Sequence, residues 1–302
     1  MKLKEKDICV ITSVSQAYLE RCGKHFLSTY NLPFKLIVYS EDKIDLSEYK
    51  NVSYEYLYSD KKFEYFINNS NPNEFENKYI KTKRNKECFK ECFEHPSPLI
   101  SRRICKTKGC KRNVRTLETK CIQHYGGGIS FVKSTKKFSY KVFSVYNAVI
   151  KYADIYKYII WLDADIVFRK NKIKKFNANF IRKNIVNKDP NFMMAFLKRY
   201  FTYSECGFFV LNLRNKITLT YCKSVVNSYL DGDVYYFQQN HDSFIWDLFR
   251  NRFIKKYDIK NIDLTDGYCE KNNIKGQNIN VLEKTKYDKF FFHAKGGLKD
   301  IT

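Results

Sequence analysis

The feature that most constrains the fold is an uninterrupted apolar stretch, Tyr158 to Leu162, that ends at two aspartates. A run of this kind is typical of a strand in a parallel sheet that helices cover on both faces. The carboxyl end of such a strand opens onto a ligand crevice, and Asp163 and Asp165 stand there. If the extended backbone continues through them, the period of two aims both side chains the same way.

These two aspartates are placed to share one ion. Side by side in a poorly solvated crevice, two carboxylates repel each other unless a cation lies between them. Ligand sets made of oxygen favour Mg²⁺ or Mn²⁺. We therefore predict that Asp163 and Asp165 bind one of these ions, the alternative being an ordinary aspartate-rich turn after a strand.

Strands and helices are predicted to alternate along most of the chain, which is typical of an α/β fold with a central, mostly parallel sheet. No internal repeat and no linker rich in proline or glycine divides the sequence, so residues 1–302 are predicted to form one domain. A polar, cysteine-bearing insertion interrupts it at about residues 59–133. The predicted strands are Ile8 to Val14, Phe34 to Ser40, Val52 to Tyr58, Tyr158 to Leu162, Asn191 to Leu197, Gly207 to Leu213 and Lys289 to Ala294, and the predicted helices are Gln16 to Tyr30, Ser139 to Tyr152, Lys216 to Tyr229 and Asp242 to Arg250.

Composition and charge narrow the class of protein. With 44% hydrophobic residues in 302, the chain can bury a sizeable core and is globular. We see neither a secretory signal nor an apolar window long enough to span a membrane, so we expect a soluble cytoplasmic protein, in a host cytoplasm if the chain is viral. The net charge of +23 would attract nucleic acid, an anionic membrane or a phosphorylated ligand. Because the lysines are scattered, we expect a solvated basic surface and no specific nucleic-acid binding.

The insertion carries four metal-type ligands, spaced as Cys-x4-Cys and Cys-x2-His with ten residues between the pairs. Such a set can wrap one tetrahedral Zn²⁺, which would stabilise a polar segment with little apolar area to bury. We predict a structural zinc, the alternative being reduced thiols without metal, and we predict reduced thiols for an incomplete cluster upstream. The zinc ligands would be Cys105, Cys110, Cys121 and His124, and the incomplete cluster is Cys88, Cys92 and His95.

A second motif lies near the carboxyl terminus, where His293, Gly296 and Lys299 form the pattern His-x-x-Gly-x-x-Lys. A neutral imidazole is a good Mn²⁺ ligand beside two carboxylates. Glycine lets backbone N–H groups approach a phosphate, and an ammonium group offsets charge on a departing nucleotide. The motif is therefore suited to complete a cation site and to hold a diphosphate.

With these two motifs the sequence resembles the nucleotide-sugar glycosyltransferases of the GT-A fold, a Rossmann-like fold, and among them the retaining, glycogenin-like glycosyltransferase family 8. The resemblance implies that Asp163, Asp165 and His293 hold Mn²⁺ or Mg²⁺, which binds the diphosphate of a nucleoside-diphosphate sugar, with a UDP-sugar foremost. It implies that Gly296 and Lys299 approach the phosphates. The resemblance covers most of the chain outside residues 59–133, and the Pro-Trp that often follows the last lysine is missing.

Two acidic residues fall near the reacting sugar in this resemblance. Glu205 and Cys206 stand where the family usually reads Asn-Ser before a glycine, and Glu205 could accept hydrogen bonds from sugar hydroxyls or stabilise a cationic transition state. An exposed loop glutamate is the alternative. Asp242 matches an aspartate of the family, with Ser243 in place of the usual glutamine, although a helix N-cap would explain it equally well.

Three further residues are assigned by position alone. Lys141 lies on the helix before the Asp163 strand, where the family carries a basic residue against the donor. Thr12 and Ser13 end the first strand, where base and ribose normally lie.

The resemblance implies transfer of a sugar, as in hexosyltransferases, to a hydroxyl on a glycan, protein or lipid acceptor. The carboxyl-terminal motif suggests retention of configuration through front-face attack. An inverting GT-A enzyme is the alternative, with Asp242 or Glu205 as the general base. A zinc-dependent nucleic-acid-binding protein is a further alternative, in which the cysteine cluster and the basic surface carry the function.

Overall fold

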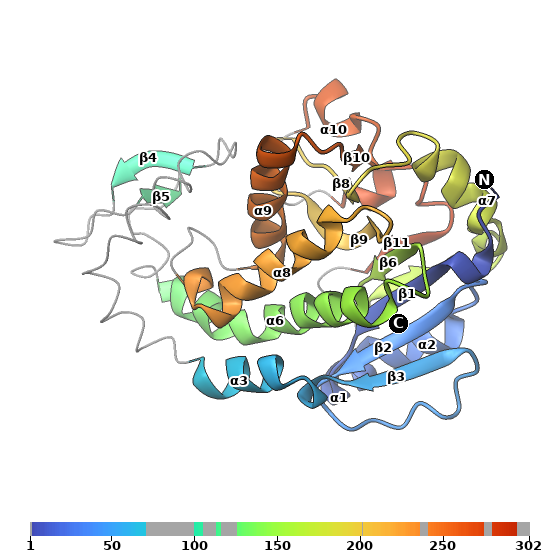
Figure 1. The fold of residues 1–302 in the computed structure, drawn as a ribbon, viewed down its shortest axis with the longest axis horizontal. Helices are drawn as coiled ribbons and strands as arrows, with labels where there is room; N and C mark the ends of the chain where they lie inside the picture. The colour runs from blue at the N-terminus through green and yellow to red at the C-terminus, as the bar shows by residue number, and fades with distance from the viewer. Residues whose placement is uncertain are drawn as a thin grey trace.

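The computed structural model describes residues 2–70, 100–104, 113–115, 126–200, 202–235, 241–274 and 280–294; for 100–104, 113–115 and 126–134 only the backbone is described. A seven-stranded sheet crosses the molecule in the order β10-β8-β9-β6-β1-β2-β3 (Figure 1). Its strands are β1 (Ile8–Ser13), β2 (Lys35–Ser40), β3 (Val52–Tyr56), β6 (Tyr158–Leu162), β8 (Met194–Leu197), β9 (Glu205–Asn212) and β10 (Ile262–Asp263).

The sheet is mostly parallel, as predicted. Only β9 runs against its neighbours, pairing antiparallel with both β6 and β8. The prediction that β6 lies between parallel neighbours is therefore wrong on one side, because its apolar run reports burial of both faces and not the direction of the adjacent strand. The parallel block β6-β1-β2-β3 brings four carboxyl ends to one edge of the sheet.

Helices cover both faces of this sheet, and the side chains of β6 divide between two cores. Ile159 and Trp161 pack with α6 (Gly126–Tyr152), α8 (Ile217–Leu230) and α9 (Asp242–Tyr257). Ile160 packs on the other face, with residues of α2 (Lys24–Thr29) and α7 (Ala178–Ile181). All five residues of β6 are consequently buried, which confirms the layered α/β arrangement.

The predicted helices and strands are present with shifted ends. The first helix consists of α1 (Gln16–Tyr18), a π-helical turn η2 (Leu19–Gly23) and α2. Helix α6 begins at Gly126 instead of near Ser139, and α9 continues past Arg250 until Asp258 adopts a left-handed conformation with φ of 49°. The remaining elements are α3 (Lys61–Asn69), α10 (Tyr268–Lys271), the two-stranded pair β4 (Ile100–Ile104) and β5 (Asn113–Arg115), and a second pair formed by β7 (Ile166–Phe168) and β11 (Phe291–His293).

The pairing of β7 with β11 positions the end of the described chain. These strands are antiparallel, with His293 opposite Ile166, so the carboxyl-terminal histidine is aligned one residue beyond the acidic pair. Asp165 fixes this arrangement through its carbonyl, which accepts a hydrogen bond of 3.0 Å from the backbone N–H of Ala294. The fold therefore brings the two sequence motifs together.

Several predictions fall outside the described residues. Among them are both cysteine clusters of the insertion, whose ligands would be Cys105, Cys110, Cys121 and His124 in the first and Cys88, Cys92 and His95 in the second. Gly296 and Lys299 also lie beyond the described part. Within that part, no helix has the length and apolar character needed to cross a bilayer.

Candidate active site

The acidic pair lies in a tight turn directly after β6. The N–H of Asp163 still donates to the carbonyl of Gly207 at 2.9 Å, but its own carbonyl accepts a 3.0 Å hydrogen bond from the N–H of Ile166. The extended backbone of β6 therefore does not continue through both aspartates. The turn nevertheless directs the two carboxylates toward one point, because the chain reverses course over Ala164.

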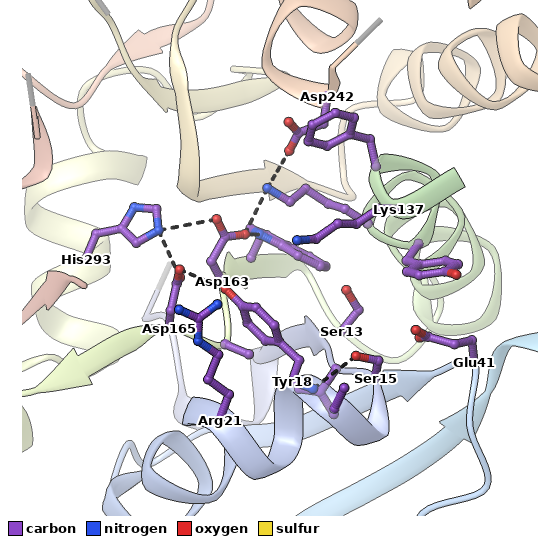
Figure 2. Close-up of a pocket in the computed structure, with 17 residues that line it drawn as sticks. Ser13, Ser15, Tyr18, Arg21, Glu41, Lys137, Asp163, Asp165, Asp242 and His293 are labelled. Carbon is purple, nitrogen blue, oxygen red and sulfur yellow. Dashed lines mark hydrogen bonds and ion pairs between the residues drawn. The ribbon is translucent and has the colours of Figure 1, made fainter. Parts of the chain in front are cut away.

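His293 completes a group of three ligands. Its Nε2 lies 2.9 Å from Oδ1 of Asp165 and 3.6 Å from Oδ2 of Asp163 (Figure 2). One ligand atom from each of the three residues lies within 4.8 Å of the others. Two carboxylates and one imidazole at this separation fit Mn²⁺ or Mg²⁺ by their chemistry.

The protonation of His293 reflects its acidic surroundings. Burial would by itself lower the pKa of His293, but hydrogen bonds to Asp165 and Glu205 outweigh it and raise the pKa to about 9. The positive charge of the imidazolium then offsets the neighbouring carboxylates. A divalent cation that displaced this proton would provide the same compensation, so metal binding is expected to release a proton.

Glu205 contacts His293 at Nδ1, the ring nitrogen that faces away from the acidic pair. Its Oε1 lies 2.9 Å from His293 Nδ1, and its Oε2 accepts from Arg199 Nη2 at 2.9 Å and from the N–H of Val281 at 3.1 Å. The carboxylate is buried, with both oxygens engaged by protein groups. The expected contact of Glu205 with a sugar does not fit this geometry, and neither does the alternative of an exposed loop residue. Glu205 instead fixes the ring orientation that turns Nε2 toward Asp165.

The close packing of this histidine depends on glycine. A Cβ atom at Gly207 would lie 2.5 Å from two atoms of the His293 ring and 3.4 Å from Oδ2 of Asp163. No real side chain tolerates the first of these distances. Gly207 therefore keeps open the space in which the imidazole approaches the acidic pair.

Lys141 connects the acidic pair to α9. Its Nζ lies 2.8 Å from Oδ1 of Asp163 and 2.5 Å from Oδ2 of Asp242, and it donates to the carbonyl of Cys206 at 3.1 Å. Burial would lower the pKa of Lys141, but Asp163 and Asp242 outweigh it and raise the pKa well above the usual range. Burial would likewise raise the pKa of Asp242, and Lys141 outweighs it and lowers that pKa. Lys141 and Asp242 thus form a buried ion pair.

Asp242 is the first residue of α9 and does not cap it. The N-cap is His241, whose Nδ1 accepts a hydrogen bond of 3.2 Å from the N–H of Phe244. The N-cap interpretation of Asp242 is therefore wrong. Its carboxylate lines the cavity described below, so it is accessible to a ligand.

Two residues that sequence reasoning missed fix the acidic pair. The hydroxyl of Tyr18 donates to Oδ2 of Asp165 at 3.0 Å, and Nε1 of Trp161 donates to Oδ1 of Asp163 at 2.7 Å. Trp161 is near the end of β6, two residues before Asp163, so the period of two could have indicated this contact. No local signal pointed to Tyr18, which lies far away in sequence.

A cavity of about 750 Å³ extends from the three ligands over the carboxyl ends of β6, β1 and β2. Its volume is within the range usual for small-molecule sites. Six of the predicted site residues line it: Ser13, Lys141, Asp163, Asp165, Asp242 and His293. Of the other predicted residues that the structure describes, Thr12 and Glu205 are buried and do not line it. Residues that were not predicted also line it, including Ser15, Tyr18, Arg21, Glu41, Lys137 and Tyr140 (Figure 2).

Comparisons with known proteins gave structural matches only. No protein-family model and no curated protein matches the sequence. Mouse xyloside xylosyltransferase 1 in its apo form is 12% identical, with 86% of each chain covered and a TM-score of 0.39. A glycosyltransferase involved in glycosylation of the major capsid of PBCV-1 is 12% identical, with 97% of this chain and 98% of that chain covered and a TM-score of 0.35. The glycosyltransferase GlyE of Streptococcus pneumoniae is 10% identical, with 97% and 55% covered and a TM-score of 0.40.

Proposed function

We propose that this protein is a metal-dependent glycosyltransferase of the GT-A type, which moves a sugar from a nucleoside-diphosphate sugar, a UDP-sugar foremost, to a hydroxyl acceptor. One observation carries the proposal. Asp163, Asp165 and His293 converge at one end of a cavity that lies over the carboxyl edge of the parallel strands. Open α/β sheets bind their ligands at this edge, outside the carboxyl ends of the strands.

The cation would be held by Oδ2 of Asp163, by Asp165 and by Nε2 of His293. Oδ1 of Asp163 is already occupied by Lys141 and Trp161, which leaves the other oxygen turned toward the histidine. Bound there, Mn²⁺ or Mg²⁺ would supply positive charge to the diphosphate of the donor. We propose that Gly296 and Lys299 contact the same phosphates, since they follow His293 closely in sequence.

The protein side chains around the cation have positioning roles. Lys141 keeps Asp163 and Asp242 in place by neutralising buried charge between α6, α9 and the acidic turn. Glu205 and Arg199 keep the imidazole of His293 oriented. Asp242 presents an anionic carboxylate to the cavity, where it could accept hydrogen bonds from hydroxyls of the donor sugar.

We propose retention of anomeric configuration. An inverting reaction needs a general base, and the lowered pKa of Asp242, which Lys141 causes by outweighing burial, makes this carboxylate a weak one. Glu205 is unsuited to that role because protein groups engage both of its oxygens. The anomeric configuration of the transfer product, measured by NMR, separates the two courses, and an inverted product would restore Asp242 as the base.

The function is tested first by donor binding, which needs no known acceptor. Thermal-shift screening of UDP- and GDP-sugars with and without Mn²⁺ should give a metal-dependent rise in Tm with at least one donor, and hydrolysis of that donor should follow. Asp165→Ala should abolish both responses, while Asp154→Ala, which removes an exposed carboxylate elsewhere, should leave them intact. If no nucleotide sugar shifts the wild-type protein at any Mn²⁺ concentration, the proposed function is wrong.

The cysteine cluster is a separate proposal. Zinc bound by Cys105, Cys110, Cys121 and His124 would stabilise the insertion without taking part in transfer. Metal analysis of the purified protein should find one zinc per chain, and Cys105→Ser should lower that content and the Tm. A protein that purifies without zinc would favour reduced thiols.

A further inference from the structure

Glu41 occupies the end of the cavity opposite the cation ligands. It follows β2 directly, and Figure 2 shows it on the far side of Ser13 from His293. Strand β2 lies beside β1, and β1 lies beside β6, whose end carries the acidic pair. Two interstrand spacings of about 4.8 Å each therefore separate the Glu41 end from the cation end. A nucleoside diphosphate anchored by its phosphates at the cation has its base at about this distance or a little beyond.

One oxygen of the Glu41 carboxyl group has no hydrogen-bond partner among the described residues. This oxygen, Oε2, is buried. Burial and the nearby charge of Asp42 raise the pKa of Glu41 to about 7, although its own backbone N–H lowers it in part. Leaving a carboxylate oxygen unpaired is costly, so this group is suited to receive a donor from a ligand.

An aromatic side chain lines the cavity beside this carboxyl. Tyr140 projects from α6 into the same cavity and is only partly buried. Burial and the charge of Glu41 raise the pKa of Tyr140 to about 12. An aromatic ring beside an unpaired acceptor is suited to a nucleobase, which can stack on the ring and donate from its own edge.

As a hydrogen-bond acceptor, the carboxylate of Glu41 distinguishes between bases by their ring N–H groups. Uracil at N3 and guanine at N1 carry a hydrogen that a carboxylate can accept. Cytosine at N3 and adenine at N1 present a lone pair instead, which would face the carboxylate without a proton between them. A base without this N–H would leave the buried carboxylate without a hydrogen-bond partner. Such a base is expected to bind much more weakly.

We propose that Glu41 is a specificity-determining residue, which accepts the imino N–H of the donor's base and thereby selects uridine or guanosine nucleotides over cytidine and adenosine nucleotides. This inference rests on the proposed donor site. It assigns to that site a base-reading group that neither sequence motif contains.

Calorimetric titration with UDP, GDP, CDP and ADP in the presence of Mn²⁺ tests it. At pH 8 the carboxyl is mostly ionised, because its pKa is about 7. Wild-type protein should bind UDP or GDP at least about tenfold more tightly than CDP and ADP, a difference that corresponds to about 1.4 kcal/mol. Glu41→Ala should reduce this preference to less than about threefold. Glu41→Gln, which adds an N–H donor without changing the shape, should bring CDP closer to UDP.

The controls separate the inference from the function on which it rests. Glu64→Ala removes an exposed carboxylate from α3 and should leave the preference unchanged. Circular dichroism and the Tm of each variant show whether it is folded. A preference that persists in both Glu41 variants, or wild-type protein that binds CDP as well as UDP, would overturn the role of Glu41 and leave the donor site standing. Absence of binding by every nucleotide would instead count against the proposed function.

Discussion

The carboxyl groups at the two ends of the cavity have different partners. At the cation end, Asp163 meets Lys141 and Trp161, and Asp165 meets Tyr18 and His293. At the other end, Oε2 of Glu41 has no partner among the residues that the structure describes. Protein side chains pair with the carboxylates at the first end, whereas the second end needs a ligand to satisfy Glu41. Substitutions at the two ends should therefore have effects of different kinds.

The largest effect is expected at the acidic pair. Asp165→Asn removes one charged cation ligand but preserves its size, and it should reduce sugar transfer at least about 1000-fold, since a bound cation contributes several kcal/mol to transition-state stabilisation. Steady-state transfer or donor-hydrolysis rates with excess Mn²⁺ measure this. Asp154→Asn is the matched surface control. A loss of less than tenfold in Asp165→Asn would mean that the cation end is not the reacting site.

Removal of the buried lysine should act mainly on stability. Lys141→Met leaves Asp163 and Asp242 without the ammonium group that both contact. Removing one partner of a buried ion pair costs roughly 3–5 kcal/mol of unfolding free energy. Urea unfolding gives the free energy of unfolding. Lys151→Met, at an exposed pair with Glu55, should cost less than about 1 kcal/mol.

A double variant tests whether this loss of stability is electrostatic. The double substitution Lys141→Met with Asp242→Asn removes one of the stranded charges and should recover part of the loss. Equal stability of the single and double variants would contradict the electrostatic account of this cluster.

A smaller effect is expected behind the histidine. Glu205→Gln retains a hydrogen-bond acceptor for His293 but removes its charge, so Mn²⁺ affinity should fall roughly tenfold while the fold persists. Titration with Mn²⁺, followed by calorimetry, measures this. Glu270→Gln, at an exposed pair with Lys198, is the control. Unchanged Mn²⁺ affinity in Glu205→Gln would exclude a positioning role for this carboxylate.

The smallest effect concerns the other end of the cavity. Because the pKa of Glu41 is raised from 4.5 to about 7, its contribution to stability is full below pH 4.5 and is lost as the pH rises toward 7. Glu41→Gln removes this loss. We therefore compare the Tm of the variant with that of the wild type, without nucleotide, at two pH values. The difference between the two proteins should be about 2 °C more in favour of the variant at pH 8 than at pH 5. Asp42, Tyr58 and Tyr140 are the neighbouring titratable groups, and Lys137 lines the same cavity. An equal difference at both pH values would show that Glu41 is already compensated.

The sheet was largely predictable because its strands are apolar on both faces. The bounds of β6 agree with the prediction at both ends, since charged or turn-forming residues flank Tyr158 and Leu162. The antiparallel direction of β9 could not be predicted, because a fully buried strand carries the same apolar pattern in either direction. The start of α6 was missed because the helix opens with three glycines, which have low helix propensity.

The site was predictable only where its residues share a motif. Asp163, Asp165 and His293 were found because each stands in a short pattern with a chemical reason. The contact of Tyr18 with Asp165 spans 147 positions, and no local pattern encodes such a distance. The buried surroundings of Glu205 could not be predicted for the same reason. Its partner Arg199 is close in sequence, but its other partner, His293, becomes a neighbour only when β11 pairs with β7.

The ion pairs described above also have a consequence for the order of binding. The carboxylates of Asp163, Asp165, Glu205 and Asp242 outnumber the cationic groups paired with them, which are Lys141, Arg199 and the imidazolium of His293. A divalent ion that replaced the proton of His293 would add positive charge there and so favour binding of a diphosphate. Metal and nucleotide affinities are then linked, and each must strengthen the other by the same factor. In a cell, the available Mn²⁺ or Mg²⁺ would in this way set how much of the donor the protein retains.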